Sequence, residues 1–153
     1  MDSNDYISIN GQSKQLTFIT ITNKNIELLE NFIVLDTSDS FRYFDKRDSS
    51  VITNHKLTII AILDKNIVGY GHLDFDKYLW LGICVIKKYQ GYGIGQKIMD
   101  YIITFADRNN NKLYLTVDKN NIIAKKIYDK YGFIVDTEES TYYKMVRNSV
   151  IKK

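Results

Sequence analysis

The chain has 153 residues, of which 44% are hydrophobic and 25% are charged, which is typical of one globular domain with its own core. Its net charge of +3 comes from lysines scattered among aspartates, which excludes the dense basic stripe of a nucleic-acid interface. The one cysteine excludes an internal disulfide, and apolar runs of about eight residues are far shorter than the roughly 20 that cross a membrane. We therefore expect a single cytosolic domain over residues 1–153, with neither nucleic acid nor a membrane as a partner.

The first fifty residues predict a strand followed by helices. Residues 14–21 alternate weakly between apolar and polar side chains, which indicates a strand. Thr22 and Asn23 can cap the helix that follows, where apolar residues recur at helical spacing. A short helical piece is expected around residues 40–47.

Residues 55–76 predict a β-hairpin that leads into a central strand. The segments 55–63 and 67–76 are rich in apolar and β-branched residues, and the polar residues 64–66 between them predict the turn. Residues 78–86 are apolar at nearly every position, which is typical of a strand that is buried on both faces.

The second half of the chain alternates helices with strands. Apolar spacing predicts a helix over residues 94–106, and residues 112–117 predict the next strand. Asp118 or Asn120 is expected to cap a further helix, which Gly132 ends in a left-handed conformation. The expected apolar face of that helix consists of Ile123, Ala124, Ile127, Tyr128 and Tyr131.

A last strand is expected at residues 140–146. A strand–helix–strand crossover after a run of hairpins predicts an α/β fold with a mixed, mostly antiparallel twisted sheet. We expect about six to seven strands, flanked by about four helices that cover both faces.

Three glycines stand between the central strand and the next helix, within the segment KKYQGYGIGQKIMD at residues 87–100. The N–H groups at a helix start are unpaired and attract anions, and Gly91, Gly93 and Gly95 would let the backbone approach a pyrophosphate closely. A tight, closely packed turn explains the same spacing. The Walker pattern and the dinucleotide pattern both fail at Gln96, which argues against a simple nucleotide or NAD.

The motif Gln90-x-x-Gly93-x-Gly95 resembles the acetyl-CoA signature of the GNAT superfamily of N-acetyltransferases. A second segment resembles the same family through Asn121, Ala124, Tyr128 and the pair Gly132-Phe133. The similarity is specific from about residue 79 to 146, and two motifs at the right separation favour the pyrophosphate site over the packed turn. The resemblance implies the GNAT (acyl-CoA N-acyltransferase) fold and transfer of an acetyl group from acetyl-CoA to a primary amine by direct attack in a ternary complex, without a metal.

The resemblance leaves the acceptor open, since a small-molecule amine and a protein or peptide amine both fit, and so do a monomer and a homodimer. A non-catalytic module that binds CoA or acyl-CoA is the alternative function. A nucleotide-binding α/β protein is a third interpretation, which requires the second motif to be a coincidence.

The resemblance also implies which residues hold acetyl-CoA. Backbone groups of the strand would pair with the pantetheine amides and the acetyl oxygen, at Ile83, Cys84 and Val85. Backbone amides of the turn would hold the pyrophosphate, at Gln90, Gly91, Tyr92, Gly93, Ile94, Gly95 and Gln96. Asn121 would hydrogen-bond the pantetheine arm. Lys125 or Lys126 would reach the 3′-phosphate, although a solvated helix lysine is an equal alternative.

By resemblance, Tyr128 matches the tyrosine that protonates the departing thiolate in many relatives. A phenol has a pKa of about 10, so it carries its proton at neutral pH. A core tyrosine on the apolar face of its helix is the alternative.

The general base is less clearly marked, because Leu79 stands where histone-type relatives carry a glutamate. Strand alternation places Tyr70, His72 and Asp74 on one face. His72 has a suitable intrinsic pKa for a base, or is a partly exposed strand histidine. Asp74 could attract a cationic amine or be solvated, and His55 carries no recognisable signal.

The remaining candidates have simple structural explanations. Cys84 could be a nucleophile but is more typical of an inert core thiol, and no Cys/His grouping has the spacing of a zinc site. The aromatic residues Tyr70, Tyr78 and Trp80 either line an acceptor pocket or pack within the sheet.

Overall fold

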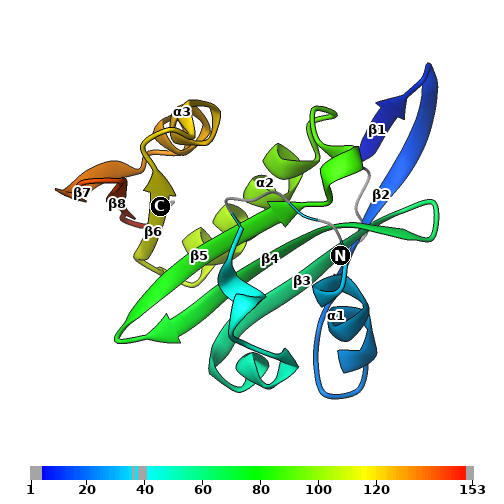
Figure 1. Ribbon diagram of the computed structural model, residues 1–153, viewed down its shortest axis with the longest axis horizontal. Helices are drawn as coiled ribbons and strands as arrows, with labels where there is room; N and C mark the ends of the chain where they lie inside the picture. The colour runs from blue at the N-terminus through cyan, green and yellow to red at the C-terminus, as the bar shows by residue number, and fades with distance from the viewer. Residues whose placement is uncertain (1–4, 36, 38–40, 151–153) are drawn as a thin grey trace.

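The computed structural model describes residues 5–35, 37 and 41–150. Its strands form one sheet in the order β1-β2-β3-β4-β5-β6-β8-β7 (Figure 1). The strands are β1 (Tyr6–Ile9), β2 (Gln12–Thr20), β3 (His55–Leu63), β4 (Asn66–Asp76), β5 (Tyr78–Val85), β6 (Leu113–Asp118), β7 (Ile134–Glu138) and β8 (Tyr142–Arg147). The α-helices are α1 (Ile26–Ile33), α2 (Ile94–Arg108) and α3 (Ile122–Lys130), and short 3₁₀ helices span Tyr43–Asp45, Ser49–Asn54 and Lys87–Tyr89.

The sheet is mixed and mostly antiparallel, as expected, and its eight strands slightly exceed the predicted number. The predicted first strand at 14–21 overlaps β2, which begins two residues earlier and ends one residue earlier, whereas β1 was not predicted. Asn10 and Gly11 join the two strands with φ angles of 51° and 78°, the left-handed pair that a two-residue hairpin turn requires. The predicted turn after β3 is confirmed, since Asp64 and Lys65 adopt φ angles of 50° and 68°.

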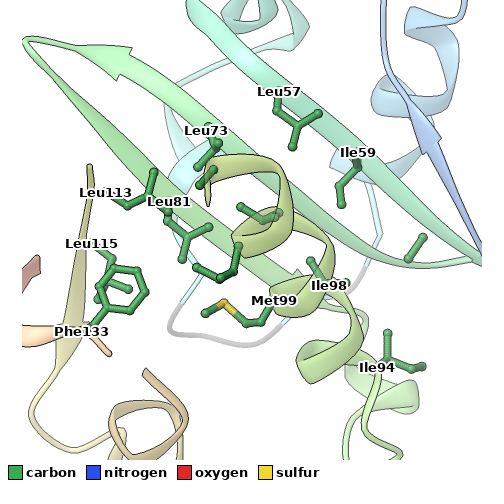
Figure 2. Close-up of a cluster of buried hydrophobic side chains, with 14 of the residues drawn as sticks. Leu57, Ile59, Leu73, Leu81, Ile94, Ile98, Met99, Leu113, Leu115 and Phe133 are labelled. Atoms are coloured by element: carbon green, nitrogen blue, oxygen red, sulfur yellow. The ribbon is translucent and has the colours of Figure 1, made fainter. Parts of the chain in front are cut away.

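Helices cover both faces of the sheet, as predicted. On one face α2 packs so tightly on β4 that an added Cβ at Gly69 would lie 2.7 Å from Ile98 Cδ1, and one at Gly71 would lie 2.6 Å from Ile102 Cδ1. Figure 2 shows the side chains of α2 meeting those of the long strands in one apolar cluster. On the opposite face, Phe32 of α1 stacks on the Tyr70 ring with a centroid separation of 4.8 Å.

β5 pairs very differently with its two neighbours in the sheet, β4 and β6. It pairs with β4 along its whole length, from Asp76↔Tyr78 to Gly69↔Val85. With β6 it forms a parallel pair at Trp80↔Tyr114, and no other aligned pair joins the described residues of these two strands. The carboxyl half of β5 therefore diverges from β6 and leaves backbone groups free on that side.

The segment from β6 to β8 lies to one side of the long strands together with α3 (Figure 1). Buried Arg147 of β8 fastens it, donating to both carboxylate oxygens of Asp107 on α2 at 2.8 and 3.1 Å. The same guanidinium donates from Nε to the Tyr131 carbonyl at 2.6 Å. These hydrogen bonds tie β8 to α2 and to the end of α3.

Two predictions in this segment were wrong, and one strand was not predicted. Asn121, and neither Asp118 nor Asn120, is the N-cap of α3, because its Oδ1 accepts the Ala124 N–H at 3.2 Å. Ile123 is 76% exposed rather than part of the packed face, because the first turn of α3 is not covered. β7 was not predicted, since all five of its side chains are exposed and show no apolar alternation.

Two smaller expectations concern the helices. The predicted helical piece at 40–47 is the short 3₁₀ helix at Tyr43–Asp45, and Ser40 lies outside the described residues. The left-handed end of α3 is confirmed, with a φ angle of 91° at Gly132. In the described part of the chain, no helix combines the length and the apolar character needed to cross a membrane.

Candidate active site

A cavity of about 470 Å³ opens where β5 and β6 diverge. Each of the surrounding elements contributes side chains. Its lining consists of Phe41, Arg42, Tyr43 and Arg47 from the segment before β3, His72, Asp74 and Asp76 from β4, Trp80, Leu81, Gly82 and Ile83 from β5, Thr116, Val117 and Asp118 from β6, and Asn121 and Tyr128 from α3 and its cap. The cavity therefore brings together predicted site residues that are far apart in the sequence.

The glycine turn lies beyond the carboxyl end of β5. Gly91 and Gly93 have φ angles of 88° and 87°, and a Cβ added at either would meet nothing within 4 Å. Backbone conformation rather than close packing thus requires these two glycines. Gly93 is the N-cap of α2 and supplies no side chain, so no side chain caps the first-turn amides of α2. Such a helix start is suited to bind an anion.

Two groups near the turn are already engaged. The Gln90 N–H donates to the Lys87 carbonyl at 3.3 Å, so this amide is not free for a phosphate as expected. The Gln90 side chain donates from Nε2 to the Val85 carbonyl at 3.1 Å. Gln90 therefore links the turn to the end of β5. The amides that remain for a phosphate are those after Gln90 in the predicted range 90–96.

Tyr128 reaches the cavity from α3. Burial raises the pKa of its phenol to about 12, so the group is fully protonated at neutral pH. Among the described residues none hydrogen-bonds to its hydroxyl, while its ring packs edge-on to Phe133 at 6.0 Å between centroids. The ring is fixed and the hydroxyl is available to a bound molecule.

Asn121 lies beside Tyr128 in the cavity wall. Its Oδ1 caps α3, which orients the side-chain amide. The Nδ2 group remains as a hydrogen-bond donor. The side chain can thus serve the helix and a ligand at the same time.

His72 is buried, with 3% of its surface exposed, and is not the partly exposed strand histidine considered above. Its Nδ1 lies 2.7 Å from the Tyr70 hydroxyl, and a Cβ at Gly82 would overlap its Nε2. Burial holds the pKa of His72 well below its ordinary value of about 6.5, with a smaller contribution from nearby His55. His72 is therefore neutral at neutral pH.

The prediction that residues 70, 72 and 74 share one face of β4 is confirmed. The three residues pair with every second residue of β5, namely residues 84, 82 and 80, so the strand is regular here.

Sequence reasoning missed a hydrogen-bonded group around Tyr43. The Tyr43 hydroxyl donates to Asp74 Oδ2 at 2.8 Å and lies 2.8 Å from His55 Nε2. His55 Nδ1 lies 2.7 Å from Thr58 Oγ1. Burial raises the pKa of Tyr43, with a further contribution from Asp74, and burial lowers that of His55. No local pattern marks these residues, because long-range folding alone brings residue 43 to residue 74.

The cavity holds charges of both signs. The Arg42 guanidinium lies 3.3 and 3.4 Å from the two carboxylate oxygens of Asp118. The Arg47 guanidinium lies 4.5 Å from the centre of the Tyr43 ring and donates to the Tyr43 carbonyl. Both arginines thus have contacts within the wall, and Asp74 and Asp76 line the same cavity from β4.

Several candidates lie outside the cavity lining. The Cys84 side chain is buried against α1, as expected for a core thiol. Lys126 is exposed, and Lys125 pairs with Asp129 at 3.1 Å. Of the three aromatic residues, Trp80 alone lines the cavity, since Tyr70 packs in the core and Tyr78 lies outside it. Within residues 5–35, 37 and 41–150, no three His, Cys, Asp or Glu side chains are grouped to hold a metal ion.

The sequence matches known acetyltransferases. A model of the Acetyltransferase (GNAT) family matches residues 24–133. Probable N-acetyltransferase san from Drosophila melanogaster is 31% identical over 138 residues, which cover 82% of this chain and 72% of that protein. L-amino acid N-acetyltransferase AaaT from Escherichia coli (strain K12) is 27% identical over 92 residues, which cover 55% and 57% of the two chains.

Solved structures share the same fold. An acetyltransferase of the GNAT family from Streptococcus pneumoniae superposes with a TM-score of 0.70 at 20% identity, covering 89% of this chain and 100% of that chain. The paia N-acetyltransferase from Thermoplasma acidophilum, solved in complex with coenzyme A, gives a TM-score of 0.66 at 15% identity, covering 88% and 99%.

Proposed function

Since the chain belongs to the GNAT acetyltransferase family, a family that transfers acyl groups from acetyl-CoA, we propose that it acetylates a primary amine by direct attack within a ternary complex. The observation that carries the proposal is the fork between β5 and β6, whose cavity is lined by Leu81, Gly82 and Ile83 of the strand that leads into the glycine turn and the uncapped start of α2. One side of the fork suits the pantetheine arm and the acetyl group, and the helix start suits the pyrophosphate.

The residues present fit acetyl-CoA. The backbone edge of β5 at Ile83 and the Val85 N–H offer amide partners to an extended pantetheine chain, in the way that a sheet edge accepts a strand, while the Val85 carbonyl accepts from the Gln90 side chain. Asn121 Nδ2 offers a further donor from the opposite wall. Bound there, acetyl-CoA supplies an activated thioester carbonyl, and the chain's own groups provide orientation and proton transfer.

Proton transfer limits such a reaction because an alkyl ammonium has a pKa of about 10.4 and is mostly charged at neutral pH. Asp74 projects a carboxylate into the cavity that can attract the ammonium and take its proton, and neutral His72 lies on the same face of β4. Tyr128 carries the proton that the leaving thiolate needs. These assignments use no covalent enzyme intermediate.

The relatives' names and the charges of the cavity wall together suggest which amines to test as acceptors. The relatives' names include an L-amino acid N-acetyltransferase and an N-alpha-acetyltransferase, so amines of small molecules and of polypeptides both belong in a screen. The mixed charge of the wall, which contains Arg42 and Arg47 as well as Asp74 and Asp76, suits an acceptor that carries polar groups beside its amine.

The experiment that tests the proposal is release of free CoA thiol from acetyl-CoA across a panel of amines. The panel contains polyamines, aminoglycosides, amino acids, and peptides with free N-termini or lysines. We expect release with at least one class, together with a product that is heavier by one acetyl group. Binding of acetyl-CoA with no release across the panel would favour the non-catalytic CoA-binding module.

A further inference from the structure

We propose that His72 donates a hydrogen bond from its Nε2–H group to the carbonyl oxygen of the acetyl group and stabilises the negative charge that forms there during transfer. The inference rests on the proposed function, because it concerns the thioester that the cavity would hold. It gives this histidine a role different from that of a proton-accepting base, and it explains why residue 82 is a glycine.

The imidazole of His72 lies across β5 at Gly82. The two residues pair in the β4–β5 ladder, and a Cβ added at Gly82 would lie 2.4 Å from His72 Nε2 and 2.6 Å from His72 Cε1. Any larger residue at position 82 would therefore displace the ring. The missing side chain leaves the space through which Nε2 reaches the cavity that both residues line.

Nε2 is the end of the ring that remains available to a ligand. His72 is only 3% exposed, and its Nε2 has no hydrogen-bond partner among the described residues. Of the fully enclosed side-chain nitrogen and oxygen atoms in the described part of the chain, Asn111 Oδ1 alone lacks a partner. Nε2 also lacks one, so it is not fully enclosed, and the open space beside it is the cavity at the fork. A bound carbonyl oxygen would supply the missing partner.

Counting protons shows that Nε2 carries a hydrogen. The Tyr70 hydroxyl is fully buried, and His72 Nδ1, at 2.7 Å, is its one hydrogen-bond partner among the described residues. The hydroxyl proton therefore goes to Nδ1, which must present a lone pair, and the proton of a neutral imidazole then lies on Nε2. Burial lowers the pKa of His72 and keeps the ring neutral. Nε2 thus points a donor, and not a lone pair, into the cavity.

Neighbouring rings hold the imidazole in this position. Its centroid lies 4.3 Å from that of Tyr43, 4.8 Å from that of His55 and 5.4 Å from that of Tyr70. Such packing leaves the ring little freedom to turn, so the donor is oriented before any ligand binds. A donor that is oriented in advance stabilises a developing charge without the cost of reorganisation.

A second donor lies next to the first along β5. The Ile86 N–H donates to the Val68 carbonyl on β4 at 2.8 Å. Because successive residues of a strand turn their backbone groups to opposite sides, the Ile83 N–H points away from β4 and toward the fork. Ile83 directly follows Gly82, over which Nε2 lies. One main-chain donor and one side-chain donor thus serve the same part of the cavity wall, as an oxyanion site requires.

The proposed position of acetyl-CoA brings its thioester to these two donors. With the pyrophosphate at the start of α2, the pantetheine arm runs back along β5, and the acyl end enters the cavity that Ile83, His72 and Tyr128 line. As the amine nitrogen bonds to the carbonyl carbon, one electron pair moves onto the oxygen, and it returns when the C–S bond breaks. Tyr128 protonates the thiolate, and the surplus proton of the new amide passes through water to replace the one that Tyr128 gave. His72 keeps its own proton throughout.

Three variants test the donor role. His72→Gln keeps a neutral N–H donor of similar reach without a basic nitrogen, whereas His72→Phe fills the space without a donor. Gly82→Ala keeps the histidine but places a Cβ where Nε2 now lies. It answers the same question if His72→Phe does not fold, since phenylalanine leaves the Tyr70 hydroxyl without an acceptor.

Two measurements are made on each variant. The first is steady-state acetylation with the best acceptor from the panel. The second is the infrared carbonyl stretch of bound acetyl-CoA that is isotope-labelled at its carbonyl carbon. This stretch falls in wavenumber when a donor binds the oxygen, it needs no acceptor, and a purely structural role of His72 would not move it.

We expect His72→Phe and Gly82→Ala to lower kcat roughly 100- to 1000-fold and to move the carbonyl stretch to higher wavenumber, with the Kd for acetyl-CoA nearly unchanged. His72→Gln should keep most of the rate and most of the lowered stretch. A stretch that is the same in the unaltered protein and in the variants without the donor would overturn the inference. A loss of rate in His72→Gln as large as in His72→Phe would also overturn it, because a base would then be missing. Failure of the unaltered protein to bind acetyl-CoA would instead overturn the proposed function itself.

Discussion

At the scale of single residues, burial shifts the pKa values of Tyr128 and His72 in opposite directions. Tyr128 is enclosed without a hydrogen-bond partner among the described residues, which raises the pKa of its phenol to about 12 and keeps its proton in place. His72 is enclosed with its Nδ1 against Tyr70, which lowers the pKa of its imidazole and keeps the ring neutral. Both shifts follow from desolvation of the charged form.

Replacing Tyr128 by Phe should remove the acid without disturbing the wall of the cavity. We expect kcat to fall roughly 100-fold, because general acid catalysis contributes about that much, while the affinity for acetyl-CoA stays nearly constant. Initial rates of thiol release give kcat, and calorimetric titration gives the affinity for acetyl-CoA, with Tyr6→Phe on β1 as a control. Equal losses in kcat and in binding would make Tyr128 a packing residue.

His72 should make the free energy of unfolding depend on pH. Its pKa is lower in the folded chain than the unfolded value of about 6.5, so its contribution is complete above pH 6.5 and is lost as the pH falls toward the folded value. The slope for one such group approaches about 1.4 kcal/mol per pH unit. Urea unfolding at a series of pH values below about 6.5 should show a shallower decline for His72→Gln than for the unaltered protein. Parallel curves would contradict the assignment.

At the scale of elements, sequence patterns predicted the parts that are locally encoded. The strand ending at Val85, the glycine turn and α2 each carry a clear signal in apolar runs, glycine spacing or helical periodicity. β1 could have been predicted too, since the Asn10-Gly11 pair is a strong hairpin signal. β7 could not, because no apolar alternation distinguishes its exposed side chains from a loop.

The residues of the candidate site also fall into those that local sequence patterns predict and those that they do not. Tyr128, Asn121 and the glycines are found through local motifs, and alternation places His72 and Asp74 on one face of β4. The partners Tyr43, His55 and Thr58 depend on how a poorly patterned segment folds across two strands, and only the three-dimensional structure reveals them.

Asn121 links an element to the site, and two substitutions separate its two roles. Asn121→Ser keeps a capping oxygen but loses the Nδ2 donor, whereas Asn121→Ala loses both. We expect Asn121→Ala to lower the free energy of unfolding by about 1 kcal/mol and Asn121→Ser to lower it much less. Both should weaken acetyl-CoA binding to a similar degree. Chemical denaturation and calorimetry measure the pair, and unchanged binding in both variants would restrict Asn121 to the cap.

At the scale of the whole molecule, the candidate site forms where β5 and β6, two neighbouring strands of the sheet, diverge. α2 and β1–β5 form a continuous packed unit, and Arg147 secures β8 to α2 on the far side of the gap. Between these two parts β5 and β6 diverge, and the cavity and the free strand edge follow from that divergence. We therefore expect acetyl-CoA binding to depend on this arrangement rather than on a single residue.

The central claim is that acetyl-CoA binds at the fork with its pyrophosphate on the start of α2, and calorimetric titration of Gly93→Val tests it most directly. Valine is strained at the φ angle of 87° and crowds the open amides. Gly11→Val, at a φ angle of 78° in the β1–β2 turn, imposes similar strain far from the fork. We predict that the unaltered protein and Gly11→Val bind acetyl-CoA, whereas folded Gly93→Val shows no binding heat. Undiminished binding by Gly93→Val would contradict the account.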